Sequence, residues 1–364
     1  MFERFAFASL FLALSTTPYG TQETHFFPAL QISPNVRTLT IYSSLDLPQA
    51  VPVVEDFQQQ HPSITVRYEE FLTTDIHERV IRESEVEGQT ADFVFSSAMD
   101  LQMKLANDGY AQPLDLPSAS EWPIWAKWRN TAFAITFEPA VFVYNEDIFD
   151  GIELPQTRGD LTDFLWSHRA MLTDKVGTYD LGSAGIGFLY FSRDLELYRD
   201  VWALVEAFGG VRARTFSTTS DILDEVQNGE LAFGYNILSS YALQRAHEDD
   251  GIGIILPSDY AIAMSRVAIV PSVAANPDLG RLFMDYLMSD RGQALLKTTL
   301  YNGSIMPNFD DATPREILMA DLGARLQPVP LGPGLLVYID DLRREQILKR
   351  WHEHYQTGLN RPPE

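Results

Sequence analysis

Two pairs of serines stand where strand-like segments give way to helix-like segments. Ser43 and Ser44 close the run LTIYSS, and Ser96 and Ser97 close DFVFSS. Further hydroxyls occupy similar positions at Thr178, at Ser183 and in the stretch 218–220. Backbone N–H groups without partners and the positive end of a helix dipole meet at such positions, so these turns readily bind phosphate, phosphonate or carboxylate groups. The alternative is that each hydroxyl only caps its own helix, the usual role of these residue types.

Other residues beside these turns have suitable chemistry. Gly185 belongs to GSAGIG, where missing side chains let the backbone approach a ligand closely. Three tyrosines and Asn236 could donate to ligand oxygens, although aromatic residues fit core packing equally well. The predicted ligand-binding residues are Ser43, Ser44, Ser96, Ser97, Thr178, Tyr179, Ser183, Gly185, Tyr235, Asn236 and Tyr260.

Motifs of catalysis and metal binding are missing from the sequence. It has no cysteine, and it contains no G-x-S-x-G, H-E-x-x-H or P-loop pattern. Its seven histidines are scattered. We therefore predict a binding protein that is not an enzyme, with no cofactor and no metal ligands. A secreted hydrolase whose catalytic carboxylates are distant in sequence remains the alternative.

The overall charge excludes some classes of partner. Among 364 residues, 27 are basic and 50 acidic, which gives a formal net charge of −23. Such a surface repels nucleic acid and anionic membrane lipids. We expect a small-molecule ligand as partner, and no nucleic acid.

The N-terminus is typical of an export signal. A positive charge at Arg4 precedes the apolar run FAFASLFLAL, which is too short to span a bilayer as a helix. We predict a signal peptide over residues 1–20, with cleavage between positions 15 and 24. The alternative is an ordinary buried N-terminal helix.

Strand-like and helix-like segments alternate after the signal. Strands are expected at 39–43, 64–71 and 92–95, with helices at 48–60, 73–87 and 101–107 between and after them. Short loops between such segments predict a parallel sheet covered on both faces. Ligands of such sheets bind at the carboxyl ends of the strands, where both serine pairs stand.

Two apolar stretches of strand character, 131–144 and 261–270, indicate crossings between two lobes. The first is too long for a typical single strand, and Pro139 in its middle indicates a bend. We predict an α/β fold with a signal peptide, a first lobe of residues 36–135 plus 265–364 and a second lobe of residues 136–264. The C-terminal helices are expected to pack on the first lobe. Arg266, on the second crossing, either neutralises an anion or forms a salt bridge.

Several stretches in this order resemble one family: LTIYSSLD, ADFVFSSAMDLQMKLANDGYAQPL, EPAVFVYNEDIF, GSAGIGFLY, NGELAFGYNILSSYA and NPDLGRLFMDYLMSDRGQALL. The chain resembles type 2 periplasmic solute-binding proteins of ABC transporters, in the branch that binds ferric iron, hexose phosphates, phosphonates or phosphoglycerate. The resemblance implies a Venus-flytrap fold with two hinge crossings and a ligand cleft between the lobes. It further implies a periplasmic monomer that serves a membrane permease. A ligand-sensing accessory of a membrane histidine kinase is the alternative role.

The resemblance also bears on the ligand. Iron-binding members use an adjacent pair of tyrosines, with a histidine or carboxylate in the first loops. This chain has Tyr235 and Tyr241, six positions apart, and serines in the first loop. We therefore expect a small anionic organic ligand that carries a phosphate, phosphonate or carboxylate group, with ferric iron as the alternative.

Overall fold

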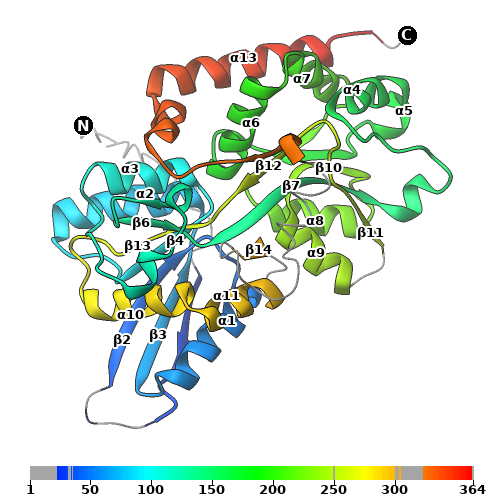
Figure 1. Ribbon diagram of the computed structural model, residues 1–364. Helices are drawn as coiled ribbons and strands as arrows, with labels where there is room; N and C mark the ends of the chain where they lie inside the picture. The colour runs from blue at the N-terminus through cyan, green and yellow to red at the C-terminus, as the bar shows by residue number, and fades with distance from the viewer. Residues whose placement is uncertain are drawn as a thin grey trace, which may run out of the picture.

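The structure is a computed structural model that describes residues 23–31, 34, 36–248, 251–299, 303–304 and 323–362. Two β-sheets, each flanked by helices, make up the molecule (Figure 1). The α/β fold with two lobes expected from the sequence is confirmed. The predicted signal peptide, residues 1–20, lies outside the described residues. None of the helices described is long and apolar enough to cross a membrane.

The first sheet has the strand order β1-β3-β2-β4-β13-β6-β5. Its strands are β1 Glu23–Phe27, β2 Arg37–Ser43, β3 Ile64–Glu70, β4 Phe93–Ser96, β5 Lys127–Trp128, β6 Ala132–Ala134 and β13 Val267–Ile269. Strands β3, β2 and β4 run parallel, as the strand–helix alternation predicts. The neighbours on both sides, β1 and β13, are antiparallel, so the complete sheet is mixed.

In the described part of the chain, five α-helices and three short helical segments surround the first sheet. The helices are α1 Leu47–Gln60, α2 Thr73–Arg82 and α3 Met99–Asn107, and α10 Pro277–Met288 and α11 Asp290–Thr299 follow later in the chain. The short helical segments are η1 Glu83–Glu87, η2 Pro117–Ser120 and η3 Ile124–Ala126. The apolar faces of α1 and α10 meet the sheet through Phe57, Phe93 and Phe283, whose rings pack edge to face.

The second sheet has the order β15-β12-β7-β10-β8-β9, and β11 and β14 also pair with β7. Its strands are β7 Thr136–Asn145, β8 Val176–Tyr179, β9 Arg214–Phe216, β10 Phe233–Leu238, β11 Ile252–Ile255, β12 Ala261–Met264, β14 Gly303–Ser304 and β15 Leu326–Pro328. The accompanying helices are η4 Glu146–Phe149, α4 Arg158–Ser167, α5 Arg169–Leu172, α6 Gly185–Leu197, α7 Val201–Gly210, α8 Thr219–Gln227 and α9 Ser239–Glu248.

The chain passes between the two sheets at two adjacent points. Ile135 separates β6 from β7, and Ser265 with Arg266 separates β12 from β13. The Ile135 amide donates to the Arg266 carbonyl over 2.9 Å, and the Arg266 amide donates to Thr136 Oγ1 over 2.8 Å. Each of the two apolar stretches therefore splits into two strands, one in each sheet, and the predicted crossings lie side by side.

The C-terminal segment packs differently from the prediction. It consists of η5 Gly323–Arg325, β15, η6 Pro333–Ile339 and α13 Asp341–Leu359. We expected its helix on the first lobe, but β15 pairs with β12 in the second sheet and α13 lies along α7 (Figure 1). Some contacts return to the part of the chain around the first sheet: η6 contacts α3, and the Leu331 amide donates to the Trp125 carbonyl over 2.8 Å. The division into lobes at residues 135 and 265 stays a prediction.

Two glycines explain why α13 docks on α7. A Cβ added at Gly209 would lie 1.9 Å from the Tyr355 carbonyl oxygen, and one at Gly358 would lie 1.8 Å from the Glu206 carbonyl oxygen. The two helix backbones are thus in direct contact, which a side chain at either position would prevent. The spacing of apolar residues along α13 does not show that α7 is the helix it packs against.

We predict that Gly358→Ala loosens α13 from α7. The added methyl group meets backbone atoms that cannot rotate away, so the free energy of unfolding should fall by about 1–3 kcal/mol. Thermal melting and limited proteolysis of α13 measure this. Gly159→Ala in α4 is the matched control, because the nearest atom to its added Cβ is Thr157 Oγ1 at 3.6 Å. Unchanged melting and protease resistance of Gly358→Ala would contradict the contact.

Candidate functional site

A cavity of about 410 Å³ lies between the two sheets, beside the crossings. This volume lies within the range of about 300–1,000 Å³ found for small-molecule sites. The first sheet and its helices supply Ser44, Asp46, Glu70, Phe71, Leu72, Thr73, Asp75 and Ser97. The second sheet and its helices supply Ile186, Ser217, Thr218, Thr219, Ser220, Asp221, Leu238 and Tyr241, and the second crossing supplies Arg266.

Hydroxyl groups from both sheets face this cavity. Strands β2 and β4 pair in parallel, with Ser43 opposite Phe95, so the loops after them are neighbours. The Ser97 amide donates to Ser44 Oγ over 3.1 Å, and the two Oγ atoms are 3.4 Å apart. On the other side, the stretch 217–220 enters α8, whose N-terminus Thr218 caps by accepting from the Asp221 amide.

The two sides of the cavity touch directly at its edges. Asp46 accepts hydrogen bonds from Tyr241 over 2.8 Å and from Ser220. The Gly185 amide donates to Thr73 Oγ1 over 3.0 Å. A Cβ at Gly185 would lie 2.8 Å from that oxygen. The close approach that Gly185 permits is therefore between α6 and α2, whereas the sequence suggested an approach to a ligand.

The guanidinium of Arg266 is buried at the cavity wall. Its Nε lies 3.2 Å from Glu138 Oε1, and its Nη1 donates to the Ser44 carbonyl over 3.3 Å. Its Nη2 has no hydrogen-bond partner among the described residues. Burial opposes the charge, but Glu138, Tyr241 and Asp46 raise the pKa of Arg266 above its ordinary value, so the group stays cationic. The salt bridge expected for Arg266 is confirmed, and the neutralisation of a ligand anion by Arg266 stays a prediction.

Carboxylates also line the cavity. Glu70 accepts from the Leu47 amide at the start of α1 over 2.9 Å. Burial, followed by the charge of Asp46, raises the pKa of Glu70 from 4.5 to about 7. Burial also raises the pKa of Asp75 in the first turn of α2. The sequence does not single out these carboxylates, because Glu70 ends a strand and Asp75 stands in the first turn of a helix, where acidic residues are common.

The predicted serines divide into three groups. Ser44 and Ser97 line the cavity. Ser183 stands just behind it, with its Oγ 2.8 Å from Ser217 Oγ. Ser43 and Ser96 are buried, and their Oγ atoms accept from the Leu45 and Ala98 amides within their own turns. These last two hydroxyls bond within the turns that follow β2 and β4, and neither of them caps the helix that comes next.

Thr178 and Tyr179 lie deeper in the second sheet. The Tyr179 hydroxyl is 2.6 Å from Thr219 Oγ1, which places it behind a lining residue. Both residues border a void of only about 10 Å³, together with Tyr235 and Asn236. A void of this size holds about one water molecule. Neither residue is among those that line the interlobe cavity.

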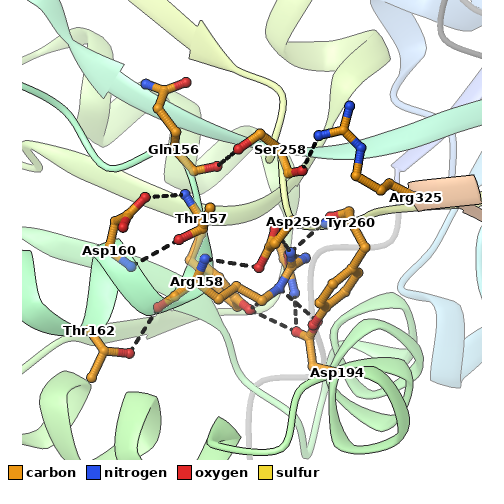
Figure 2. Close-up of polar contacts among 12 residues, drawn as sticks. Gln156, Thr157, Arg158, Asp160, Thr162, Asp194, Ser258, Asp259, Tyr260 and Arg325 are labelled. Atoms are coloured by element: carbon orange, nitrogen blue, oxygen red, sulfur yellow. Dashed lines mark hydrogen bonds and ion pairs between the residues drawn. The ribbon is translucent and has the colours of Figure 1, made fainter. Parts of the chain in front are cut away.

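Three further predicted residues meet at a buried arginine instead of the cavity. Figure 2 shows Arg158 and Tyr260 converging on Asp194, with Arg158 Nε 3.0 Å and the Tyr260 hydroxyl 2.6 Å from Oδ1. Tyr235 and Asn236 bind Oδ2 of the same carboxylate at 2.8 and 2.6 Å. The network joins α4, α6, β10 and the loop before β12. Both oxygens of the Asp194 carboxylate accept hydrogen bonds in this network, as in a polar cluster that stabilises the fold.

Within the described residues, no cluster of three or more histidine, cysteine, aspartate or glutamate side chains could hold a metal ion. The two tyrosines discussed for iron are also separated. Tyr241 faces the cavity edge and binds Asp46, whereas Tyr235 belongs to the Arg158 network. Burial raises the pKa of both hydroxyls well above the ordinary tyrosine value.

Comparisons with known proteins agree with this arrangement. Residues 53–317 match the family described as bacterial extracellular solute-binding protein. The substrate-binding protein of an ABC transporter from Agrobacterium tumefaciens is 44% identical, with a TM-score of 0.90 over 93% of this chain and 100% of that chain. No curated protein matches the sequence.

More distant structures share the fold alone. Iron-bound HitA from Pseudomonas aeruginosa has 17% identity and a TM-score of 0.69, over 85% of this chain and 99% of its own. AfuA from Actinobacillus pleuropneumoniae, solved with fructose-6-phosphate, has 16% identity and a TM-score of 0.68, over 88% of this chain and 98% of its own. The ligands of these two proteins differ, so the fold does not identify the ligand of this chain.

We predict a pH-dependent effect of Glu70→Gln on the stability of the ligand-free protein. A glutamate ionises near 4.5 in the unfolded chain and near 7 in the fold, so the folded state loses stability as pH rises between these values. Glutamine does not titrate and can still accept from the Leu47 amide. The variant should melt about 2–4 °C above the wild type at about pH 8, a difference that shrinks toward acid pH.

Scanning calorimetry across this pH range measures the effect. Glu121→Gln, on an exposed carboxylate outside the cavity, is the matched control. A pH-independent difference between Glu70→Gln and the wild type would show that the cavity does not perturb Glu70.

Proposed function

This chain belongs to the family of bacterial extracellular solute-binding proteins, and on that premise we propose that it captures a small organic acid in the interlobe cavity. It then presents the ligand to the membrane permease of an ABC transporter. In this proposal the protein works in the periplasm as a monomer after export, and it binds its ligand without converting it. A membrane histidine kinase is the alternative recipient of the ligand-bound form.

The observation that carries the acid assignment is the buried Nη2 of Arg266, which has no hydrogen-bond partner among the described residues. Arg266 itself lines a cavity rich in hydroxyl groups. A buried donor without a partner costs stability unless a ligand satisfies it. A phosphate, phosphonate or carboxylate would accept from Nη2 and from the neighbouring Ser44 and Ser97 hydroxyls. Each hydrogen bond to such a charged group contributes about 1.5–3 kcal/mol.

The contacts between the two sides of the cavity support capture by closure. Asp46 with Tyr241, and Thr73 with Gly185, join residues that lie on opposite sides of the crossings. The crossings themselves are two short, paired segments, which suit a hinge. A ligand that contacts both sides would favour the closed arrangement over an open one.

Ferric iron remains the competing ligand, because one structural relative is an iron-bound protein. Iron prefers anionic oxygen ligands. In this chain Tyr241 already donates to Asp46, and burial favours its neutral form. These observations favour an organic acid over iron.

We predict that Ser97→Ala weakens acid binding about tenfold or more, which corresponds to about 1.4 kcal/mol. Isothermal titration with 3-phosphoglycerate, glucose 6-phosphate, methylphosphonate and citrate measures the affinities, and ferric citrate tests the iron alternative. Ser96→Ala is the matched control, because Ser96 is buried and bonds only within its own turn. It should lower the melting temperature and leave affinity unchanged.

A second variant tests the arginine without leaving a buried charge unpaired. Arg266→Gln combined with Glu138→Gln removes both members of the ion pair, so it avoids the cost of an isolated buried carboxylate. Acid binding should be lost while the protein stays folded. Acid affinity that survives in both Ser97→Ala and this double variant would refute the proposed site, and tight ferric binding lost in Tyr241→Phe would favour iron.

A further inference from the structure

Four carboxylates line the cavity, and they are poorly matched by the cation present. They belong to Asp46, Glu70, Asp75 and Asp221. None of the four forms an ion pair with another described residue. With Arg266 as the one cation of this lining, the formal net charge is −3 when all four carboxylates are ionised and −2 when Glu70, whose pKa is raised to about 7, holds its proton.

The partners of these groups do not cancel that charge. The guanidinium of Arg266 pairs with Glu138, a fifth carboxylate directly behind it. Asp46 is satisfied by the neutral hydroxyls of Tyr241 and Ser220. Hydroxyls stabilise a carboxylate by hydrogen bonding, but they carry no charge and leave the field of the carboxylate in the cavity.

A simple anion therefore fits only part of the lining. Its acid group can accept from Arg266 Nη2, Ser44 and Ser97, but the rest of the molecule would lie among unpaired carboxylates. Repulsion between the negative charge of the ligand and these carboxylates opposes binding. A protonated amine on the same molecule would remove this repulsion and give Glu70 and Asp75 a partner.

We infer that the ligand is zwitterionic: a small acid that also carries a protonated amine. The acid group binds at Arg266 and the serines, and the amine binds the carboxylates at the starts of α1 and α2. This inference rests on the proposed function, because it assumes that the interlobe cavity holds an organic acid. It adds a second, cationic recognition element to that site.

Matched pairs of compounds that differ in the amine test the inference. The probes are glucosamine 6-phosphate with glucose 6-phosphate, phosphoethanolamine with ethyl phosphate, and 4-aminobutyrate with butyrate, plus glucosamine as an amine without an acid. Thermal stabilisation and isothermal titration of the full chain, up to about 10 mM of each compound, give the affinities. In at least one pair, we expect the compound that carries the amine to bind about tenfold or more tightly than the compound without it.

The outcomes separate the two hypotheses. Equal or tighter binding of the amine-free acids overturns the zwitterion inference and leaves the proposed acid-binding function standing. Binding of glucosamine but of no acid overturns the proposed function while supporting an amine site. Binding of none of the compounds counts against both.

A carboxylate variant tests the same point from the protein side. Asp75→Asn should weaken the amine-bearing probe about tenfold and its amine-free partner less than about twofold, because only the amine interacts with that charge. Asp147→Asn is the matched control, since it changes the net charge equally but is exposed and outside the cavity. Equal losses for both probes in Asp75→Asn would mean that Asp75 only supports α2, and the inference would fail.

Discussion

The ion pair between Arg266 and Glu138 joins the two crossings on which the arrangement of the sheets depends. Arg266 lies between β12 and β13, and Glu138 lies on β7 just after the other crossing. Both side chains are almost fully buried, so each would be costly without the other. Thr136 and Ser240 donate to the Glu138 carboxylate over 2.6 Å each, so each of its two oxygens accepts a hydrogen bond. The pair joins the crossings and leaves Nη2 of Arg266 without a hydrogen-bond partner among the described residues.

A second buried arginine organises the larger sheet in a comparable way. Arg158 contacts Asp194 and Asp259, and its guanidinium lies 3.7 Å from the centre of the Tyr260 ring. The loop before β12 is thereby tied to α4 and α6. Since β12 leads directly into the second crossing, this network positions the strand that carries Arg266 into the hinge. Arg158 therefore holds the loop at the start of β12, and Arg266 holds the crossing at its end.

The sequence indicated the fold because its main determinants are local. Alternating apolar segments with short loops predict the βαβ core, and two apolar stretches of strand character predict the crossings. The docking of α13 was not predictable, because it depends on Gly209 and Gly358, residues far apart in sequence that allow one backbone contact. Helical periodicity predicts which face of a helix is buried, but it does not predict which element that face packs against.

The site was only partly predictable for a related reason. Ser44 and Ser97 were found because strand ends of a parallel sheet converge. Tyr235 and Asn236 were placed at the cleft, but β10 contains an irregularity between Gly234 and Ile237, and Asn236 has a φ of 58°. Neighbouring residues of a regular strand face opposite sides, and this bulge lets both contact the same Asp194 carboxylate. Nothing in the residue types reveals such a bulge.

Asp46 couples the shape of the cavity to the contact between the lobes. It lines the cavity, and it also accepts hydrogen bonds from Tyr241 and Ser220 across the interface. These three residues border a second hollow of about 300 Å³ on their other side, so they form a wall between two open spaces. A ligand group that hydrogen-bonds to Asp46 must either share the carboxylate oxygens with the Tyr241 and Ser220 hydroxyls or displace those hydroxyls. Ligand recognition and closure at this edge thus use the same carboxylate, and a substitution there changes both together.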